Sequence, residues 1–376
     1  MYDVIVAGVG GMGSATLYHL ARRGLKVLGL EQFDIPHEFG SSHGVTRIIR
    51  LAYAEHPNYV PLLRRAYALW RELEVEADER LLIITGGLDI GEPETAVVRG
   101  SLEACARHDL PHEILDAETL GQRFPGYQLP QSMVGIYQPD AGFLLPERCI
   151  VTHVNAALQR GAEVHTREPV IEWGAEQGSV WVRTDRETYR ARRLVITAGP
   201  WARNFVPALD AFAVPERQVL LWTQPLRPKL FTLGSFPIFY MEAPEGHYYG
   251  FPEYGIPGFK IGKYHHRNER VDPDHMDRDC HPEDEAVLRE AIRNYFPDAN
   301  GPAVAMKTCL FTNSPDEHFI LDHHPQHREV VIAAGFSGHG FKFCSVIGEI
   351  MAQLALDGGT QLNTEMFRLG RFGEQG

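Results

Sequence analysis

The chain has 376 residues, of which 44% are hydrophobic, 10% aromatic and 23% charged, a composition that excludes a disordered or fibrous protein and suits two or three domains. Its 36 Lys and Arg against 49 Asp and Glu give a formal net charge of −13, which disfavours nucleic acid and membrane surfaces as partners. No run reaches the roughly 18 apolar residues of a membrane helix, and five cysteines without a CxxC pair give neither a disulfide framework nor a zinc signature, so we expect a cytoplasmic protein.

A dinucleotide-binding signature occupies residues 4–31. A β-branched run, glycines at GxGxxG spacing, a helical stretch, a second strand and an acidic residue follow one another in the order that such a site needs. Gly8 would permit a tight turn, Gly10 would let the backbone approach a pyrophosphate, and Gly13 would let the helix pack closely on the strand. Glu31 is placed to accept hydrogen bonds from the adenosine ribose. This segment predicts a dinucleotide site but leaves FAD and NAD open.

A long polar and glycine-rich segment, residues 33–50, follows where a nicotinamide dehydrogenase would begin its next βα unit. It contains Arg47 and Arg50, three residues apart and within one helical turn, so the two cations can point to similar places. Surface arginines on a solvated loop are the alternative interpretation.

A second anion-binding pattern lies near the other end of the chain. The apolar strand 330–334 runs into the glycine-rich turn 335–343, and a helix is predicted from about residue 344 to 356. A glycine-rich turn that opens a helix offers N–H donors and a positive dipole end. Such a turn suits a reduced flavin, which carries its negative charge at the pyrimidine end.

These segments resemble the monomeric sarcosine oxidase and N-methyltryptophan oxidase family of flavoprotein amine oxidases. The resemblance implies an FAD-dependent oxidase, a monomer, that converts sarcosine with O2 and water to glycine, formaldehyde and hydrogen peroxide. The same chemistry on N-methyltryptophan, L-pipecolate or a related secondary amino acid is the alternative. The matching segments are 8–31, 42–44, 46–50, 248–252, 260–262, Cys309, 314–317 and 335–343.

The resemblance also implies roles for single residues. Cys309 matches the cysteine joined through sulfur to the 8α-methyl group of FAD. Arg50 and Lys342 match the two cations that hold the substrate carboxylate, for which a guanidinium and an ammonium are well suited. Lys260 matches the lysine beside the flavin N5 where oxygen is reduced. The other expected catalytic residues are Arg47, His339, His265 and Tyr249. The expected cofactor-binding residues, besides Cys309, are Gly8, Gly10, Gly13, Glu31, Ser42, His43, Thr46, Val170, Gly338, Gly340 and Lys342.

Three positions depart from the family pattern. Val45 stands where the family usually has Asp, which removes a carboxylate near the flavin, and Phe311 stands where relatives have Tyr. The family histidine four residues after the oxygen-site lysine falls on Tyr264. Either the loop has one extra residue and His265 serves, or that role is lost. These changes affect the expected substrate more than the expected reaction.

We therefore expect an α/β (α+β) fold in two parts. Residues 1–80, 145–215 and 308–376 would form a discontinuous, Rossmann-like FAD-binding domain. Residues 81–144 and 216–307 would form a substrate domain with a mainly antiparallel sheet. The 18 histidines show no HExxH pattern and no paired Cys, so we expect no metal.

Overall fold

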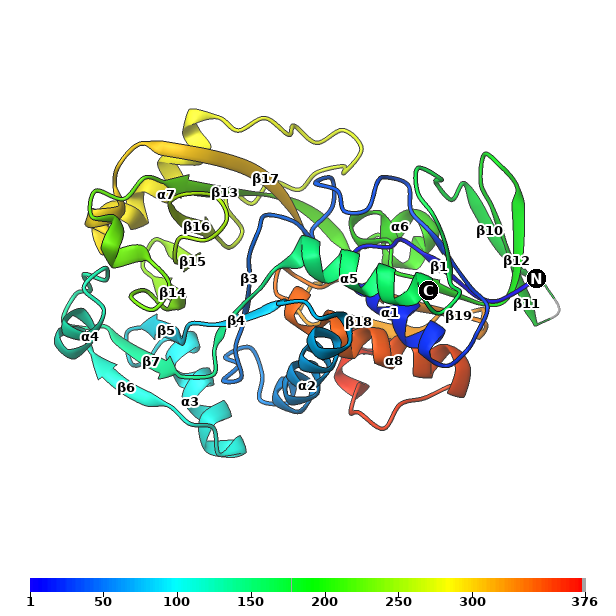
Figure 1. Cartoon of the computed structure of the whole chain (residues 1–376), viewed down its shortest axis with the longest axis horizontal. Helices are drawn as coiled ribbons and strands as arrows, with labels where there is room; N and C mark the ends of the chain where they lie inside the picture. Colours follow the sequence, from blue (N-terminus) through cyan, green and yellow to red (C-terminus); the bar gives the residue numbers. More distant parts are fainter. Residues whose placement is uncertain (177, 374–376) are drawn as a thin grey trace.

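The computed structural model describes residues 1–176 and 178–373. Two large sheets of eight strands each lie at the two ends of an elongated molecule, the first in the right half of Figure 1 and the second in the left half. The predicted fold, a Rossmann-like sheet combined with a second, mainly antiparallel sheet, is confirmed.

The first sheet has a parallel core. Its parallel strands are, in spatial order, β9 (Glu163–His165), β2 (Val27–Leu30), β1 (Tyr2–Ala7), β12 (Thr188–Ile196) and β19 (Val330–Ala334). Three antiparallel strands extend it: β18 (Ile320–His323) beside β19, and β11 (Ser179–Arg183) and β10 (Glu172–Glu176) beside the first half of β12. β1 is paired at both edges, and its residues from Val4 to Ala7 are fully buried because both faces of the sheet are covered: Val4 and Val6 pack in one core, Ile5 and Ala7 in another.

Four helices form a layer beside this sheet. α1 directly follows the glycine-rich turn after β1 and contacts both α5 and α8, while α2 packs on α8. Tyr53, Tyr59 and Trp70 are fully buried in the core that this layer encloses. The helices are α1 (Gly11–Arg22), α2 (Tyr59–Ala77), α5 (Pro146–Leu158) and α8 (Cys344–Asp357).

The second sheet is antiparallel except for one pair of neighbours. Its strands are, in spatial order, β17 (Ala303–Asn313), β13 (Val214–Thr223), β16 (Phe259–Lys263), β15 (Gly246–Phe251), β14 (Ile238–Ala243), β5 (Gly87–Gly91), β7 (Val134–Gln138) and β6 (Glu113–Asp116). Only the β14 and β5 pair is parallel. Its helices are α3 (Ala96–His108), α4 (Ala117–Arg123) and α7 (Pro282–Tyr295), and stacked aromatic rings such as Tyr127 and Phe236 fill its core.

A small sheet lies between the two large ones. It consists of β3 (Arg47–Ile49), β8 (Gly142–Leu144) and β4 (Leu82–Ile84), and it fixes the segment that carries Arg47 and Arg50 (Figure 1). The remaining elements are α6 (Ala202–Phe205) and short 3-10 helices at Gly199–Trp201, Pro207–Leu209, Pro228–Phe231, Pro297–Ala299, Phe341–Phe343, Glu365–Phe367 and Leu369–Phe372.

The division into two domains stays a proposal. Its boundaries at 215/216 and 307/308 fall inside β13 and β17, which pair along their whole length and carry the chain between the two halves. Within the part of the chain that the structure describes, no helix combines the length and the apolar character needed to cross a membrane.

Candidate functional site

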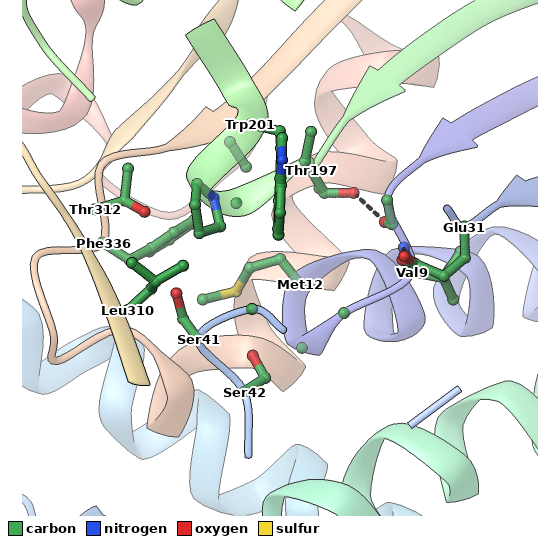
Figure 2. A pocket seen from close by; sticks show the side chains of 18 of the residues that line it. Val9, Met12, Glu31, Ser41, Ser42, Thr197, Trp201, Leu310, Thr312 and Phe336 are labelled. Atoms are coloured by element: carbon green, nitrogen blue, oxygen red, sulfur yellow. Dashed lines mark hydrogen bonds between the residues drawn. The ribbon is translucent and has the colours of Figure 1, made fainter. Parts of the chain in front are cut away.

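An elongated cavity lies at the carboxyl ends of the parallel strands. Counted together with the open solvent at its mouth, its empty space is about 1520 Å³. The ends of β1, β2, β12 and β19 and the turns that follow them line it, together with the loop 35–42 and residues 310–312 of β17. Open α/β sheets bind ligands at this edge. Figure 2 shows Met12, Thr197 and Trp201 around the cavity, with Leu310 and Phe336 on its other side.

The turn after β1 is shaped for close contact with a ligand. A Cβ on Gly13 would lie 1.8 Å from the carbonyl oxygen of Gly8, so only glycine allows the helix to start this close to the strand. A Cβ on Gly10 would meet nothing within 4 Å, because this residue borders the cavity. The first N–H groups of α1 are therefore accessible to an anion at a helix N-terminus.

Glu31 is held rigidly at the end of β2. Its carboxylate accepts hydrogen bonds from the N–H groups of Val9 (2.8 Å) and Phe33 (3.1 Å). The side chain lines the cavity although it is only 4% exposed, and burial raises the pKa of Glu31. Thr197, at the end of β12, donates to the carbonyl oxygen of Gly8 at 2.7 Å and so joins the two strand ends (Figure 2).

Several other expected cofactor residues lie along the same cavity or next to a residue that lines it. Ser42, Val170, Gly338 and Gly340 line it. His43 is buried behind Ser42, and neither of its ring nitrogens has a partner among the described residues. Burial and the nearby cations, Arg47 first, lower the pKa of His43 well below its usual value. A buried imidazole without partners points to a further polar group at this place.

Cys309 lies on β17, directly before Leu310, which lines the cavity. Its sulfur is 3.4 Å from Nη2 of Arg47 and 3.8 Å from the carbonyl oxygen of Ser41, and the residue is 3% exposed. Arg47 also donates to the carbonyl oxygens of Ser41 and Thr46. The expected attachment residue and the expected arginine are thus brought together.

Lys260 is fixed on β16 next to the same loop. Its Nζ donates to the carbonyl oxygens of Gly44 (2.6 Å) and Thr46 (2.9 Å) and to Oγ1 of Thr46 (2.9 Å). It lies 4.4 Å from the centroid of the Phe251 ring. Burial, helped by Arg47, lowers the pKa of Lys260 well below its usual value.

Arg50 and Lys342 form a second buried cluster. Each lies 5.0 Å from the centroid of the Tyr53 ring, and Lys342 Nζ donates to the carbonyl oxygen of His339 at 2.9 Å. Burial and then Arg50 lower the pKa of Lys342 to about 7. Nδ1 of His339 lies 2.6 Å from the Tyr53 hydroxyl, and burial lowers the pKa of His339 to about 4. The two cations that are expected to bind the carboxylate, Arg50 and Lys342, therefore both lie next to the Tyr53 ring.

The sequence did not point to the acidic partners of Arg50. Nη2 of Arg50 lies 3.2 Å from Oε2 of Glu55, and its Nε lies 3.1 Å from Oδ1 of Asp89. Glu55 is only five residues away and could have been noticed for that reason. Asp89 comes from β5, and no local pattern connects it with Arg50.

Tyr264 and His265 are neighbours whose side chains have different partners. The Tyr264 ring packs against Tyr249 and Phe311, with centroids 5.9 and 5.0 Å away. His265 instead lies between the carboxylates of Glu216 and Glu317, at 3.1 and 3.0 Å. Hydrogen bonds to these two carboxylates raise the pKa of His265 to about 10. The His265 ring also packs edge-on against the Tyr264 ring, with centroids 5.9 Å apart, so both alternatives, a role for His265 or the loss of that role, stay open.

A parallel sheet with a cavity of dinucleotide-binding geometry at its strand ends, next to a buried lysine on a second sheet, is typical of a flavin-dependent oxidoreductase. The family described as FAD dependent oxidoreductase matches residues 3–354. The chain belongs to this family and, within it, to the monomeric sarcosine oxidase and N-methyltryptophan oxidase group of flavoprotein amine oxidases.

Individual relatives are similar along nearly the whole chain. A monomeric sarcosine oxidase from Bacillus sp. (strain NS-129) is 41% identical over 375 residues, which cover 98% of this chain and 97% of the relative. An N-methyl-L-tryptophan oxidase from Yersinia pestis (strain Pestoides F) is 33% identical over 374 residues, which cover 99% of this chain and 99% of the relative. The solved structure of NikD, an unusual amino acid oxidase essential for nikkomycin biosynthesis, is 25% identical, has a TM-score of 0.85 and covers 98% of this chain, with 97% of its own length matched.

Proposed function

We propose that the protein is an oxidase of small secondary amino acids that acts on sarcosine and forms glycine, formaldehyde and hydrogen peroxide from sarcosine, water and O2. The observation that carries the proposal is the buried pair of cations, Arg50 and Lys342, on the Tyr53 ring. Two convergent positive charges are the binding site that a carboxylate needs. The 41% identity to a monomeric sarcosine oxidase supports sarcosine as the substrate.

The described residues fit FAD. Gly10 leaves the helix N-terminus open for a pyrophosphate, and Glu31 stands where a ribose would be bound. In the part of the chain that the structure describes, the ring nitrogens of buried His43 have no partner. We further propose that Cys309 is the attachment residue. Its sulfur lies 3.4 Å from Nη2 of Arg47, a residue that lines the cavity, and this places a cation beside the bond to be formed.

The bound flavin supplies two-electron oxidation of the carbon–nitrogen bond. Arg50 and Lys342 hold the carboxylate so that the methylated amine faces the cavity, and this orientation replaces a bimolecular encounter by a nearly intramolecular step. The rings of Tyr249, Tyr264 and Phe311 form an aromatic wall that excludes water. Such a wall disfavours the protonated form of the substrate amine, and the amine must be neutral to react. Lys260 is a fixed positive charge that stabilises the negative charge developing on oxygen.

Two further parts of the proposal concern the state of the protein. We propose a monomer, supported by the similarity to relatives that are named monomeric sarcosine oxidases. We also propose a reducing compartment, the cytoplasm, supported by five free cysteines. Within residues 1–176 and 178–373, no group of three or more His, Cys, Asp or Glu is arranged to hold a metal ion.

A panel of substrates tests the specificity. Peroxide release by the purified holoenzyme should give the highest kcat/KM with sarcosine, and lower values with N-methyl-L-tryptophan and L-pipecolate. A preference for N-methyl-L-tryptophan would favour the second candidate, which the 33% identity to an N-methyl-L-tryptophan oxidase supports.

Acid precipitation tests the attachment. The yellow colour should stay with the precipitated protein, and mass spectrometry should find the flavin on the peptide that contains Cys309. Cys309→Ser should release the colour into the supernatant, whereas Cys280→Ser, at a half-buried free thiol, should not. Release of the colour from the unmodified protein would contradict covalent attachment.

A further inference from the structure

The loop 44–46, next to Lys260, has an unusual backbone. Gly44 has φ +98° and Val45 has φ +73°, so two consecutive residues are in the left-handed region. A β-branched residue is strongly disfavoured there, because its Cβ crowds the backbone. Such a conformation persists only where surrounding contacts impose it.

Glu147 supplies one of these contacts. Its Oε1 accepts hydrogen bonds from the N–H groups of both Gly44 (2.6 Å) and Val45 (3.1 Å). Successive N–H groups that converge in this way form an anion-binding concavity, and here the anion is a side chain of the protein itself. Glu147 lies in the first turn of α5, where the helix dipole also stabilises a carboxylate.

Lys260 supplies the contacts on the opposite side. Its three donors are used by the carbonyl oxygens of Gly44 and Thr46 and by the Thr46 hydroxyl. The carbonyl of Gly44 and the N–H of Val45 belong to the same peptide group. A single peptide unit therefore lies between the carboxylate of Glu147 and the ammonium of Lys260, and each ion polarises it in the sense that strengthens the other hydrogen bond.

We propose that Glu147 is the positioning residue for Lys260: by binding the N–H groups of Gly44 and Val45, it holds the loop in the form that presents three oxygen acceptors to the ammonium, and it acts as counter-ion through the peptide. This inference rests on the proposed function, because it assigns Lys260 to oxygen reduction. The charged or titratable groups facing Lys260 are Arg47 from β3, Glu147 from α5 and Cys309 from β17. Glu147 is the acidic group among them.

Reoxidation kinetics of the holoenzyme test the proposal. Glu147→Gln keeps an oxygen acceptor for the two N–H groups but removes the charge. In the unmodified protein, the rate at which O2 reoxidises the dithionite-reduced enzyme should fall as the pH rises and Lys260 loses its proton. In Glu147→Gln we expect this fall to begin about one pH unit lower, because the negative charge that favours the Lys260 ammonium is gone. Anaerobic reduction by sarcosine should change less than about twofold. Glu79→Gln, an exposed carboxylate of a neighbouring segment, should leave both half-reactions unchanged.

Thermal unfolding gives a second readout that does not depend on turnover. Glu147→Ala should lower the unfolding midpoint more than Glu147→Gln does, because it leaves two N–H groups without an acceptor. Val45→Gly removes the backbone conflict. Adding Glu147→Ala to Val45→Gly should therefore lower the unfolding midpoint less than adding Glu147→Ala to the unmodified protein. Additive effects would contradict the coupling between Glu147 and the loop conformation.

The outcomes separate the two proposals. Slow reoxidation in Lys260→Met with an unchanged pH profile in Glu147→Gln would overturn the role of Glu147 and leave the proposed function standing. Equal slowing of both half-reactions in Glu147→Gln would also overturn it, because a general structural defect would explain the result. Normal reoxidation in Lys260→Met would contradict the oxygen site itself.

Discussion

Oε2 of Glu55 lies 3.2 Å from Nη2 of Arg50, so the guanidinium that we assign to the substrate carboxylate already contacts a carboxylate of the protein. Burial alone would raise the pKa of Glu55, but Arg50 holds it below its usual value. A ligand carboxylate must therefore displace Glu55 or share the guanidinium with it.

We expect Glu55→Gln to strengthen the binding of acetate at pH 6 about tenfold, because a negative charge next to the bound carboxylate is removed. Acetate has no amine, so its binding reports on the carboxylate site alone, and it can be followed by the change in the flavin absorption spectrum. Glu94→Gln, at a side chain that is 90% exposed, is the control and should bind acetate as the unmodified protein does. Weaker binding in Glu55→Gln would show that Glu55 supports the site instead of competing for it.

Lys342 should make carboxylate binding depend on pH. Burial and Arg50 lower the pKa of Lys342 to about 7, so this ammonium loses its proton as the pH rises through that value. A bound carboxylate favours the charged form, and binding should therefore be accompanied by proton uptake near pH 7. We expect the Kd of acetate to increase as the pH is raised beyond 7, with a slope that approaches tenfold per pH unit.

Lys342→Arg is the matched variant for this prediction, since a guanidinium keeps its charge at all these pH values. Its acetate Kd should be nearly constant between pH 6 and 9. His339, whose pKa burial lowers to about 4, stays neutral in this range and should not contribute. A flat profile in the unmodified protein would mean that Lys342 is not part of the carboxylate site.

Local patterns predicted the form of the turn after β1 and the place of Glu31 beside it. The turn at Gly8, Gly10 and Gly13 and the acid at Glu31 lie within one strand–helix–strand unit, where spacing alone sets the geometry. Contacts between distant segments could not be predicted in this way. Asp89 reaches Arg50 only because β5 joins the second sheet, and Glu147 binds Gly44 across more than a hundred residues.

The end of β16 shows a different limit. Spacing from Lys260 placed the family histidine on Tyr264 and left open whether His265 serves instead or the role is lost, because the local backbone decides which of two neighbours turns inward. His265 has φ +52°, and its ring is held by Glu216 and Glu317, so Tyr264 takes the inner place beside Phe311. A left-handed residue of this kind has no reliable signal in the sequence.

Lys260→Met should separate the two half-reactions. The variant removes the buried positive charge, and we expect reoxidation of the reduced flavin by O2 to slow about a hundredfold, while anaerobic reduction by sarcosine changes much less. Stopped-flow absorbance measures both rates. Lys263→Met, on the same strand and half-buried over the Tyr248 ring, is the control and should keep both rates. Equal slowing of the two half-reactions by Lys260→Met would refute its role with oxygen.

His153 should make the stability of the fold sensitive to acid. Its ring is packed between Tyr18 and Trp70, with centroids 5.4 and 5.2 Å away, and its Nδ1 has no partner among the described residues. Burial lowers the pKa of His153 to about 3. Below pH 6.5 the unfolded chain therefore binds a proton that the folded chain does not, and the free energy of unfolding decreases as the pH falls toward 3.

His153→Phe keeps a ring at this position and removes the titration. Between pH 7 and pH 5 the unmodified protein should lose about 2 kcal/mol more of its free energy of unfolding than the variant does, since one pH unit corresponds to about 1.4 kcal/mol per proton. Urea unfolding of the holoenzyme at the two pH values measures the difference. His275→Gln, at a side chain that is 83% exposed, should leave the pH dependence as it is. If His153→Phe loses as much stability on acidification as the unmodified protein, the buried imidazole is not the group that senses the pH.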